Sequence, residues 1–318
     1  MRSTWGALLS LAAIIGMRVG QAEAQEFTSI SDGVFADSTV AYPADGTVVY
    51  PHEIDSGFVS PPISNPLTDS ASSSYGFLRK DFMDGVGYED GATTVGAFIP
   101  LAMTSNSGFF FQPQVFITDV GDAGVNFGGG FRAYMPEADR VIGAYGFYDN
   151  DESFHDHRRN QIAVGVETLG PMWDFRINGY IPLDDDEDFL GPGPGGLGRF
   201  EQAIGGADIE FGIPIFDPSA FGRLRAYFGL YAYGSDDKLD DDPAGARVRL
   251  EGHLNQHATF NASFMHDDKF GDMVTMYVEF RGWSSRLPGM DNTNTSNRAK
   301  LYLPAVRQYR IANEVFFQ

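Results

Sequence analysis

The chain has 318 residues and a formal net charge of −21, because 43 Asp and Glu residues outnumber 22 Lys and Arg residues. Nucleic-acid phosphates would repel such an acidic chain, so we exclude a nucleic-acid partner. The chain contains no cysteine, which excludes a disulfide framework, a cysteine-built zinc site and thiol catalysis.

The N-terminus predicts a secretory signal peptide over residues 1–24. Arg2 precedes an apolar run from Trp5 to Met17, and Ala22-Glu23-Ala24 has the small-x-small pattern of a cleavage site. This run is shorter than the roughly 20 residues that a membrane-spanning helix needs, and no later run reaches that length. We therefore expect an exported protein that would enter a membrane only through β-strands.

Residues 25–74 and residues 75–283 differ in character. The first stretch is rich in Ser, Pro, Asp and Thr without sustained periodicity, which is typical of a disordered segment, here in the periplasm. The second consists of short runs in which apolar and polar residues alternate, the period-2 pattern of β-strands. In the run 173–181, one face carries Trp173, Phe175 and Ile177, and the other carries Asp174, Arg176 and Asn178.

The number and length of these runs favour a membrane barrel over a soluble β-sandwich, although both architectures alternate in this way. Most runs reach the about 9–11 residues that a tilted strand needs to cross a bilayer. Because bacterial single-chain barrels have an even number of strands, we expect a twelfth strand near Tyr75 to Met83. The other eleven expected strands lie near residues 94–103, 108–118, 123–135, 140–149, 160–169, 173–182, 205–214, 223–235, 246–253, 257–266 and 272–281.

Loop length and aromatic placement also favour the barrel. Tight connections, such as 104–107 and 170–172, alternate with longer acidic ones, such as 150–159 and 183–197, as expected of short periplasmic turns and longer extracellular loops. Interfacial aromatic girdles would lie at strand ends, where we find Phe109 to Phe111, Tyr145 to Tyr148, Tyr227 to Tyr233, Phe280 and Trp283. We predict an all-β, twelve-stranded antiparallel transmembrane β-barrel over residues 75–283.

The polar face of such a barrel lines its lumen. Charged and amide residues at the alternate strand positions that form this face are therefore expected to be luminal. They could line a path for a threaded peptide, form the selectivity lining of a diffusion pore, or fill the lumen with salt bridges that conduct nothing. The expected lumen-lining residues are Arg132, Glu167, Asp174, Arg176, Asn178, Glu210, Arg249, Glu251, Glu279 and Arg281.

Three segments carry distinctive motifs. Residues 145–151 contain aromatic residues followed by Asp149 and Asp151, in an aromatic-x-Asp-x-Asp pattern. Residues 173–183 end in an Asn-Gly-Tyr-x-Pro pattern, and residues 124–132 carry an Asn-Phe-Gly-x-Gly-x-Arg pattern. Together these motifs resemble the barrel of inverse autotransporters, the intimin and invasin family, and the resemblance covers roughly residues 95–280. The family-motif residues are Asp149, Asp151, Asn178, Gly179, Tyr180 and Pro182.

The resemblance implies a barrel in the outer membrane of a Gram-negative bacterium, surrounded by outer-membrane lipid and inserted by the barrel-assembly machinery. In that family, a linker after the last strand threads the lumen and leads to a passenger of Ig-like domains. Residues 284–318 look like the start of such a linker, in which Arg307 and Arg310 could pair with luminal acids. We expect an anchor and translocator whose passenger is absent or truncated, with a porin-like diffusion channel as the alternative.

Other binding sites are supported less well by the sequence. The acidic runs Asp184–Asp188 and Asp236–Asp242 offer oxygen ligands that suit divalent cations. Neither run has EF-hand spacing, and solvated surface loops explain them better. The Gly-rich stretch 191–196 lacks the Lys and Ser/Thr of a phosphate-binding loop. Surface cations at the acidic loops are therefore the one ionic partner that we retain.

Enzymatic activity is not expected. Asp149, Asp151, His155 and His157 could supply zinc ligands, and the neighbouring His155 and Asp156 could activate water as a protease pair does. However, the two aspartates already belong to the aromatic-x-Asp-x-Asp pattern, which resembles a hairpin loop of that family. No second set of catalytic residues is visible elsewhere. We predict no catalytic residue, no metal centre and no cofactor.

Overall fold

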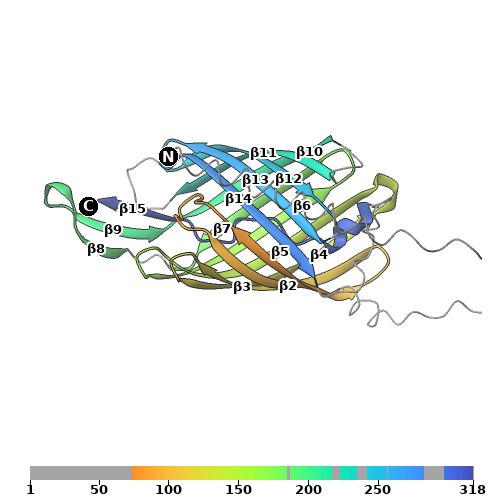
Figure 1. Ribbon diagram of the computed structural model, residues 1–318, viewed down its shortest axis with the longest axis horizontal. Helices are drawn as coiled ribbons and strands as arrows, with labels where there is room; N and C mark the ends of the chain where they lie inside the picture. The colour runs from red at the N-terminus through yellow and green to blue at the C-terminus, as the bar shows by residue number, and fades with distance from the viewer. Residues whose placement is uncertain are drawn as a thin grey trace, which may run out of the picture. The chain divides into compact units, whose positions relative to one another are not determined.

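The computed structural model describes residues 74–184, 187–216, 223–234, 242–255, 257–282 and 297–317. The expected signal peptide, and all but the last residue of the expected segment 25–74, lie outside these residues. Within the described part of the chain, twelve antiparallel strands close into one barrel (Figure 1). They are β1 (Tyr75–Asp81), β2 (Ala92–Met103), β3 (Ser107–Thr118), β4 (Ala123–Met135), β5 (Arg140–Glu152), β6 (Arg158–Leu169), β7 (Asp174–Pro182), β10 (Gly205–Phe216), β11 (Arg223–Gly234), β12 (Ala244–His253), β13 (Ala258–Asp267) and β14 (Gly271–Gly282).

The first and last barrel strands close the sheet. β1 pairs with β14 from Gly76 opposite Gly282 to Asp81 opposite Tyr277, and with β2 on its other edge. Every barrel strand therefore has two partners, which leaves no unpaired backbone edge for the lipid. The twelfth strand expected near Tyr75 is present, and the twelve-stranded prediction is confirmed.

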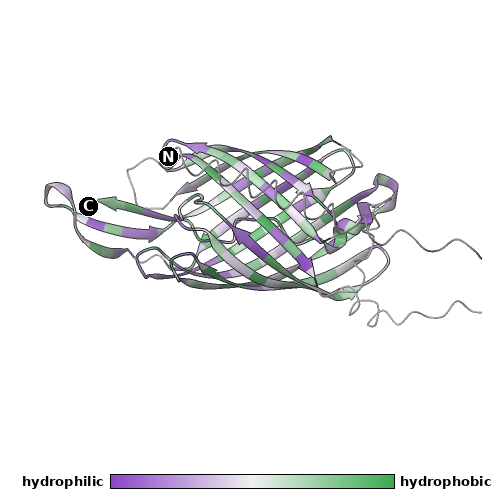
Figure 2. Ribbon diagram, in the orientation of Figure 1, coloured by the Kyte–Doolittle hydropathy of each residue, from purple (hydrophilic) through white to green (hydrophobic). Residues whose placement is uncertain are grey.

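The burial of side chains is inverted relative to a soluble sandwich. On β6, the apolar Val166 is 51% exposed whereas the neighbouring Glu167 is 5% exposed. The same alternation runs along the other strands, so that hydrophobic residues cover the outer surface of the barrel (Figure 2). This arrangement suits a protein surrounded by lipid, because the apolar face contacts hydrocarbon and the polar face is enclosed. Among the described residues, no helix has the length and apolar character needed to cross a membrane.

The connections between strands gather at two ends of the barrel. One end, which we call the turn end, carries the connections 104–106, 136–139, 170–173 and 254–257, of which the second contains η2 (Pro136–Ala138). The other end, the loop end, carries the connections 82–91, 119–122, 153–157, 183–204 and 268–270.

A second, three-stranded sheet lies at the loop end. It consists of β8 (Asp188–Pro192), β9 (Gly198–Ala203) and β15 (Asn313–Phe317), in the order β15-β9-β8. The stretch 183–197 was expected to be a loop, but it contains the strand β8, and its Gly- and Pro-rich part forms the tip of the β8–β9 hairpin. Gly195 and Gly196 have φ of 72° and 84° within η3 (Pro194–Gly196), a conformation that favours glycine.

The C-terminal residues belong to the same compact unit as the barrel. The helical turn η4 (Asn297–Tyr302) begins at the turn end, where the Asn297 amide donates a 2.7 Å hydrogen bond to Asp139. The chain then continues without regular secondary structure to β15 at the loop end. We call residues 297–312 the luminal segment.

The aromatic residues at strand ends correct one expectation. Tyr145, Phe147, Tyr227 and Tyr231 are buried and share the luminal phase of their strands instead of forming an outer girdle. Two of these rings contact the polypeptide in the lumen, since the Tyr145 hydroxyl donates to the Val306 carbonyl at 3.2 Å and the Phe147 ring lies against Arg307. The Arg307 guanidinium lies 4.1 Å from the centroid of the Phe147 ring. Half-exposed rings on the outer surface are Phe109, Phe228 and Phe280, and Trp283 lies outside the described residues.

Candidate functional site

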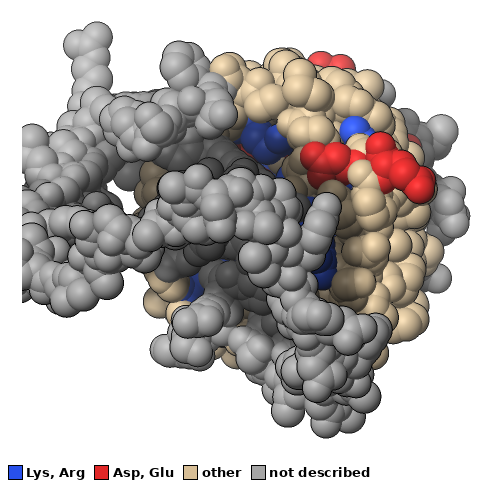
Figure 3. Space-filling model, turned by 90° about the vertical axis from the view of Figure 1, so that its right-hand side faces the viewer, with Lys and Arg blue, Asp and Glu red and all other residues tan. Residues whose placement is uncertain are grey.

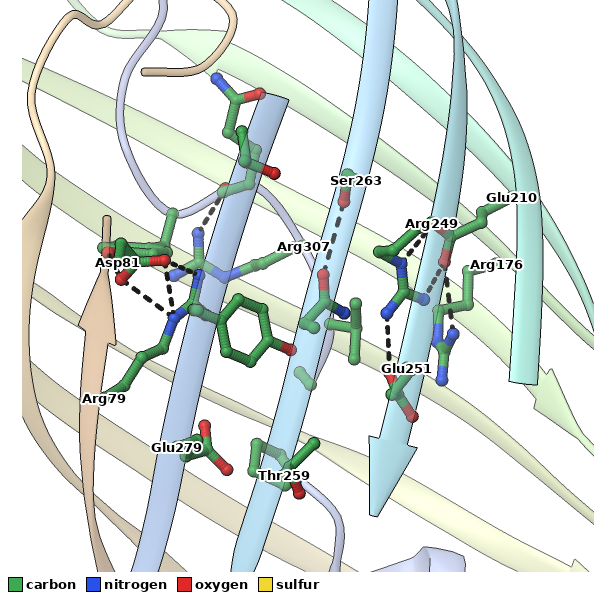
Figure 4. Close-up of a pocket in the computed structure, with 18 of the residues that line it drawn as sticks. Arg79, Asp81, Arg176, Glu210, Arg249, Glu251, Thr259, Ser263, Glu279 and Arg307 are labelled. Carbon is green, nitrogen blue, oxygen red and sulfur yellow. Dashed lines mark hydrogen bonds and ion pairs between the residues drawn. The ribbon is translucent and has the colours of Figure 1, made fainter. Parts of the chain in front are cut away.

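All ten residues expected to line the lumen are buried. Most of them form a connected ionic network on the inner wall. Arg249 binds Glu210 at 2.5 Å and Glu251 at 2.6 Å (Figure 4). Arg132 binds Glu167 at 2.6 Å. Figure 3, which looks at the turn end, shows basic side chains inside the ring of the barrel. The remaining pairs among the ten are Arg176 with Glu210 at 3.4 Å, Arg176 with Glu167 at 3.6 Å, and Arg281 with Glu279 at 2.7 Å.

Two arginines of the luminal segment bind two aspartates of β5. Arg307 donates to both carboxylate oxygens of Asp149, at 2.6 and 2.7 Å. Arg310 Nε donates to Asp151 Oδ2 at 2.7 Å, and the Ile311 amide donates to the same oxygen at 3.2 Å. The two aspartates lie two residues apart on one strand, so both point to the same, luminal face. These charge-assisted bonds are well buried, since the Arg307 and Asp149 side chains are 3% and 0% exposed.

The backbone of the luminal segment is bound by side chains of the barrel. The Tyr180 hydroxyl accepts a hydrogen bond from the Gln308 amide at 2.9 Å and donates one to Asp208 at 2.6 Å. The Asn178 amide donates to the Val306 carbonyl at 3.4 Å. Further contacts are Ala305 N to Gln112 Oε1 at 3.0 Å and Asn126 Nδ2 to Tyr309 O at 3.2 Å. The part of the segment that follows η4 has no regular secondary structure, and the wall thus pairs several of its backbone polar groups.

At the turn end, the helical turn η4 is bound in the same manner. Lys300 donates to the Gly170 carbonyl at 2.6 Å and to Asp174 at 3.0 Å. Arg132 donates to the carbonyls of Leu301, at 3.3 Å, and Leu303. These contacts connect the luminal segment to the ionic network of the wall.

The family-motif residues divide into two groups. Asp149, Asp151, Asn178 and Tyr180 contact the luminal segment through the hydrogen bonds described above. Gly179 lies on the outer face of β7, where an added Cβ would meet a methyl group of Val164 at 3.6 Å. Pro182 is the last residue of β7. The motif therefore combines luminal contacts with positions that shape the strand itself.

Several luminal contacts were not anticipated from the sequence. Tyr309 donates a 2.6 Å hydrogen bond to Asp81, and Asp208 accepts from both Asn178 and Tyr180. Asp208 could have been predicted to face the lumen, because it lies two positions before Glu210 on β10 and therefore points to the same side. Gln112 lies in a strand whose inward positions also include Phe110 and Phe116, so alternation of polarity gave little indication of its role.

The four side chains considered for zinc do not converge. Asp149 and Asp151 bind the arginines of the luminal segment, whereas His155 Nδ1 lies 2.8 Å from Glu201 and His157 Nδ1 lies 3.4 Å from Asp188. Within the described residues, no three His, Cys, Asp or Glu side chains are grouped as metal ligands. Most of the acidic run 236–242 and part of the run 184–188 lie outside these residues, so the expectation of surface cations stays a prediction.

Residues 73–276, more than half of the chain, match the family model described as "Inverse autotransporter, beta-domain". No curated protein matches the chain. A membrane protein solved in a study of in-meso crystallization is 19% identical with a TM-score of 0.59, and the match covers 76% of this chain and 100% of that one.

Two further solved structures are more distant. An outer membrane channel from Pseudomonas putida F1 is 12% identical, with a TM-score of 0.45 and coverage of 67% of this chain and 96% of that one. The β-domain of the Bordetella autotransporter BrkA is 12% identical, with a TM-score of 0.31 and coverage of 65% and 96%. At these identities, the likeness to solved structures concerns the fold alone.

Proposed function

The chain belongs to the inverse autotransporter β-domain family, and on this premise we propose that its luminal segment is a linker fixed across the outer membrane. The barrel itself is the outer-membrane anchor and translocator of a Gram-negative bacterium. In our proposal the turn end faces the periplasm and the loop end faces the exterior, as is general for such barrels. The linker then runs outward from η4 to β15.

The two arginine–aspartate pairs carry this proposal. Asp149 and Asp151 are two residues apart on a strand, whereas Arg307 and Arg310 are three residues apart in the linker. A shift of the linker by one residue, about 3.3 Å along an extended chain, would break both pairs at once. Each broken pair would leave buried charges without a partner, which is strongly unfavourable. The pairs therefore specify one resting register of the linker.

This arrangement favours an anchor over the porin-like alternative. A diffusion channel needs an open lumen, whereas here the segment 297–312 is bound to the inner wall by side chains of β3, β4, β5 and β7. We assign no reaction to the barrel. Outer-membrane lipid is its surrounding, and the barrel-assembly machinery is the partner that we propose for its insertion.

A cysteine pair across β9 and β15 tests whether the linker ends at the loop end. Ala203 and Asn313 are direct partners in the register of these antiparallel strands, where Cα atoms lie about 4.5–5.5 Å apart. That spacing suits a disulfide, and the chain has no other cysteine. We expect Ala203→Cys/Asn313→Cys to cross-link rapidly in cells under mild oxidation.

The matched control shifts one cysteine along β15. Ala203→Cys/Phe317→Cys moves it four residues, about 13 Å along a strand, and should cross-link poorly. Equal cross-linking of the two pairs, or none in either, would contradict the proposed position of the linker.

A further inference from the structure

The linker does not fill the lumen by itself. A cavity of about 120 Å³ lies beside it, between residues 303–309 and a wall formed mainly by β1, β12, β13 and β14. Its lining runs from His253 and Arg281, near the turn end, to Val86 and Tyr88, beneath the loop end. Figure 4 shows Arg307 of the luminal segment on one side and Thr259 and Ser263 of β13 on the other.

The walls of this cavity combine polar and apolar side chains. Charged residues of the ionic network alternate there with small polar side chains such as Thr259 and Ser263. The Asn261 Nδ2 atom is buried and, among the described residues, has no hydrogen-bond partner. A polar cavity with a free donor favours occupancy by water. The part of the lumen beside the linker can therefore hold water.

An apolar cluster closes the lumen at the loop end. Val86 of the β1–β2 loop is 2% exposed, Ile204 at the β9–β10 junction 0%, and Ala312 of the linker 1%. Together with Met265 and Met273, which pair across β13 and β14, they belong to one buried hydrophobic cluster. We call these five residues the mouth cluster. Val86 and Met265 also line the cavity, so the cluster borders it. Apolar constrictions oppose the passage of ions because water fills them poorly.

The β1–β2 loop is bound directly to the linker. The Asn313 amide donates to the Gly87 carbonyl at 3.0 Å, and the Gln308 side chain donates to the Val86 carbonyl at 3.2 Å. On the opposite side, the Ile204 amide donates to the Ala312 carbonyl at 2.9 Å. The linker thus passes between the loop and the β9–β10 junction, and both are hydrogen-bonded to its backbone.

Gly87 is required for this close approach. Its φ is +71°, and an added Cβ would lie 2.6 Å from the backbone nitrogen of Asn313 and 2.7 Å from Ala312 Cα. Because both atoms belong to the backbone, a side chain at this position would push the loop away from the linker. From this geometry we propose that the β1–β2 loop, docked on the linker through Val86 and Gly87, is the seal that closes the barrel to ions.

The inference rests on the proposed threading of the linker, so its test fixes the linker first. The Ala203→Cys/Asn313→Cys disulfide provides a full-length parent in which the linker cannot leave the lumen. Current is then measured across a planar lipid bilayer for the parent and for Gly87→Ala in the same cross-linked background. The expected result is no steady current in the parent and a steady ionic current in the variant.

Gly271→Ala is the matched control, because Gly271 has a φ of +72° but open space around its would-be Cβ. It carries the same backbone strain without the collision, and we expect no current from it. Val86→Asp, which introduces a charge into the mouth cluster, should conduct as Gly87→Ala does.

The outcomes separate the two proposals. If neither Gly87→Ala nor Val86→Asp passes a steady ionic current, the assignment of the seal is wrong. A current in the cross-linked parent would overturn it as well. Failure of the disulfide to form would count against the threaded linker instead.

Discussion

Breaking the Arg307–Asp149 pair from either side should release the linker locally without unfolding the barrel. Arg307→Met and Asp149→Asn each preserve much of the side-chain volume while removing one charge. The remaining partner is then a buried, unpaired charge, because the Asp149 side chain is 0% and that of Arg307 3% exposed. Removing one member of a buried pair costs about 3–5 kcal/mol. At about 1.4 kcal/mol per factor of ten, the opening equilibrium of the linker should rise roughly a hundredfold to a few thousandfold.

Amide hydrogen exchange of the linker measures that opening directly. The amides of Ala305, Gln308 and Ile311 are bound by side chains of the barrel and not by a helix or sheet of their own. Their exchange therefore requires undocking of the linker. The double variant Asp149→Asn/Arg307→Met has no unpaired charge, so its cost should fall well below the sum of the two single costs.

A surface ion pair supplies the control. Arg158 and Glu152 are 3.3 Å apart, with side chains 53% and 25% exposed, and Arg158→Met should cost only about 0.2–1 kcal/mol. The reasoning would be refuted if the single luminal variants changed exchange no more than Arg158→Met does. A free-energy cost of the double variant equal to the sum of the two single costs would also refute it.

Three further changes probe other parts of the molecule. Tyr180→Phe removes the acceptor of the Gln308 backbone amide, which costs about 1–3 kcal/mol. Exchange of that amide should therefore rise about fivefold to 150-fold, and an unchanged rate would argue against the bond. Val164→Arg, on the lipid-facing side near the middle of β6, should lower the free energy of unfolding in vesicles by about 2–4 kcal/mol, whereas Val164→Leu should not. Phe316→Ala removes the ring stacked 5.8 Å from Phe200 and should destabilise β15 by about 3 kcal/mol. The yield of the Ala203→Cys/Asn313→Cys disulfide should then fall. An unchanged yield would show that the ring does not stabilise β15.

The barrel could be predicted from the sequence because its determinants are local. Alternation within each strand assigns an inner and an outer face, and the parity rule for closed barrels supplied the strand near Tyr75. The sheet of β8, β9 and β15 could not be found in this way. Val315 pairs with Glu201 across more than a hundred residues of chain, and no local pattern encodes such a partner.

The luminal contacts were predicted only in part for a related reason. Arg307 and Arg310 stood out as cations expected to meet luminal acids, but Asp149 and Asp151 were read as part of a hairpin loop. The structure extends β5 to Glu152, which gives both aspartates the inward phase of Tyr145. The collision at Gly87 is a tertiary contact between segments far apart in the sequence, so the sequence contained no signal for it.

The threaded linker is tested most directly by labelling its two ends in intact cells. Arg298→Cys lies at the start of the luminal segment and Val315→Cys in β15, and both original residues are exposed. A maleimide attached to a polymer too large for porins should label Val315→Cys in intact cells. It should label Arg298→Cys only after the outer membrane is permeabilised. Equal labelling of both positions in intact cells, or labelling of Arg298→Cys alone, would contradict a linker that runs outward through the barrel.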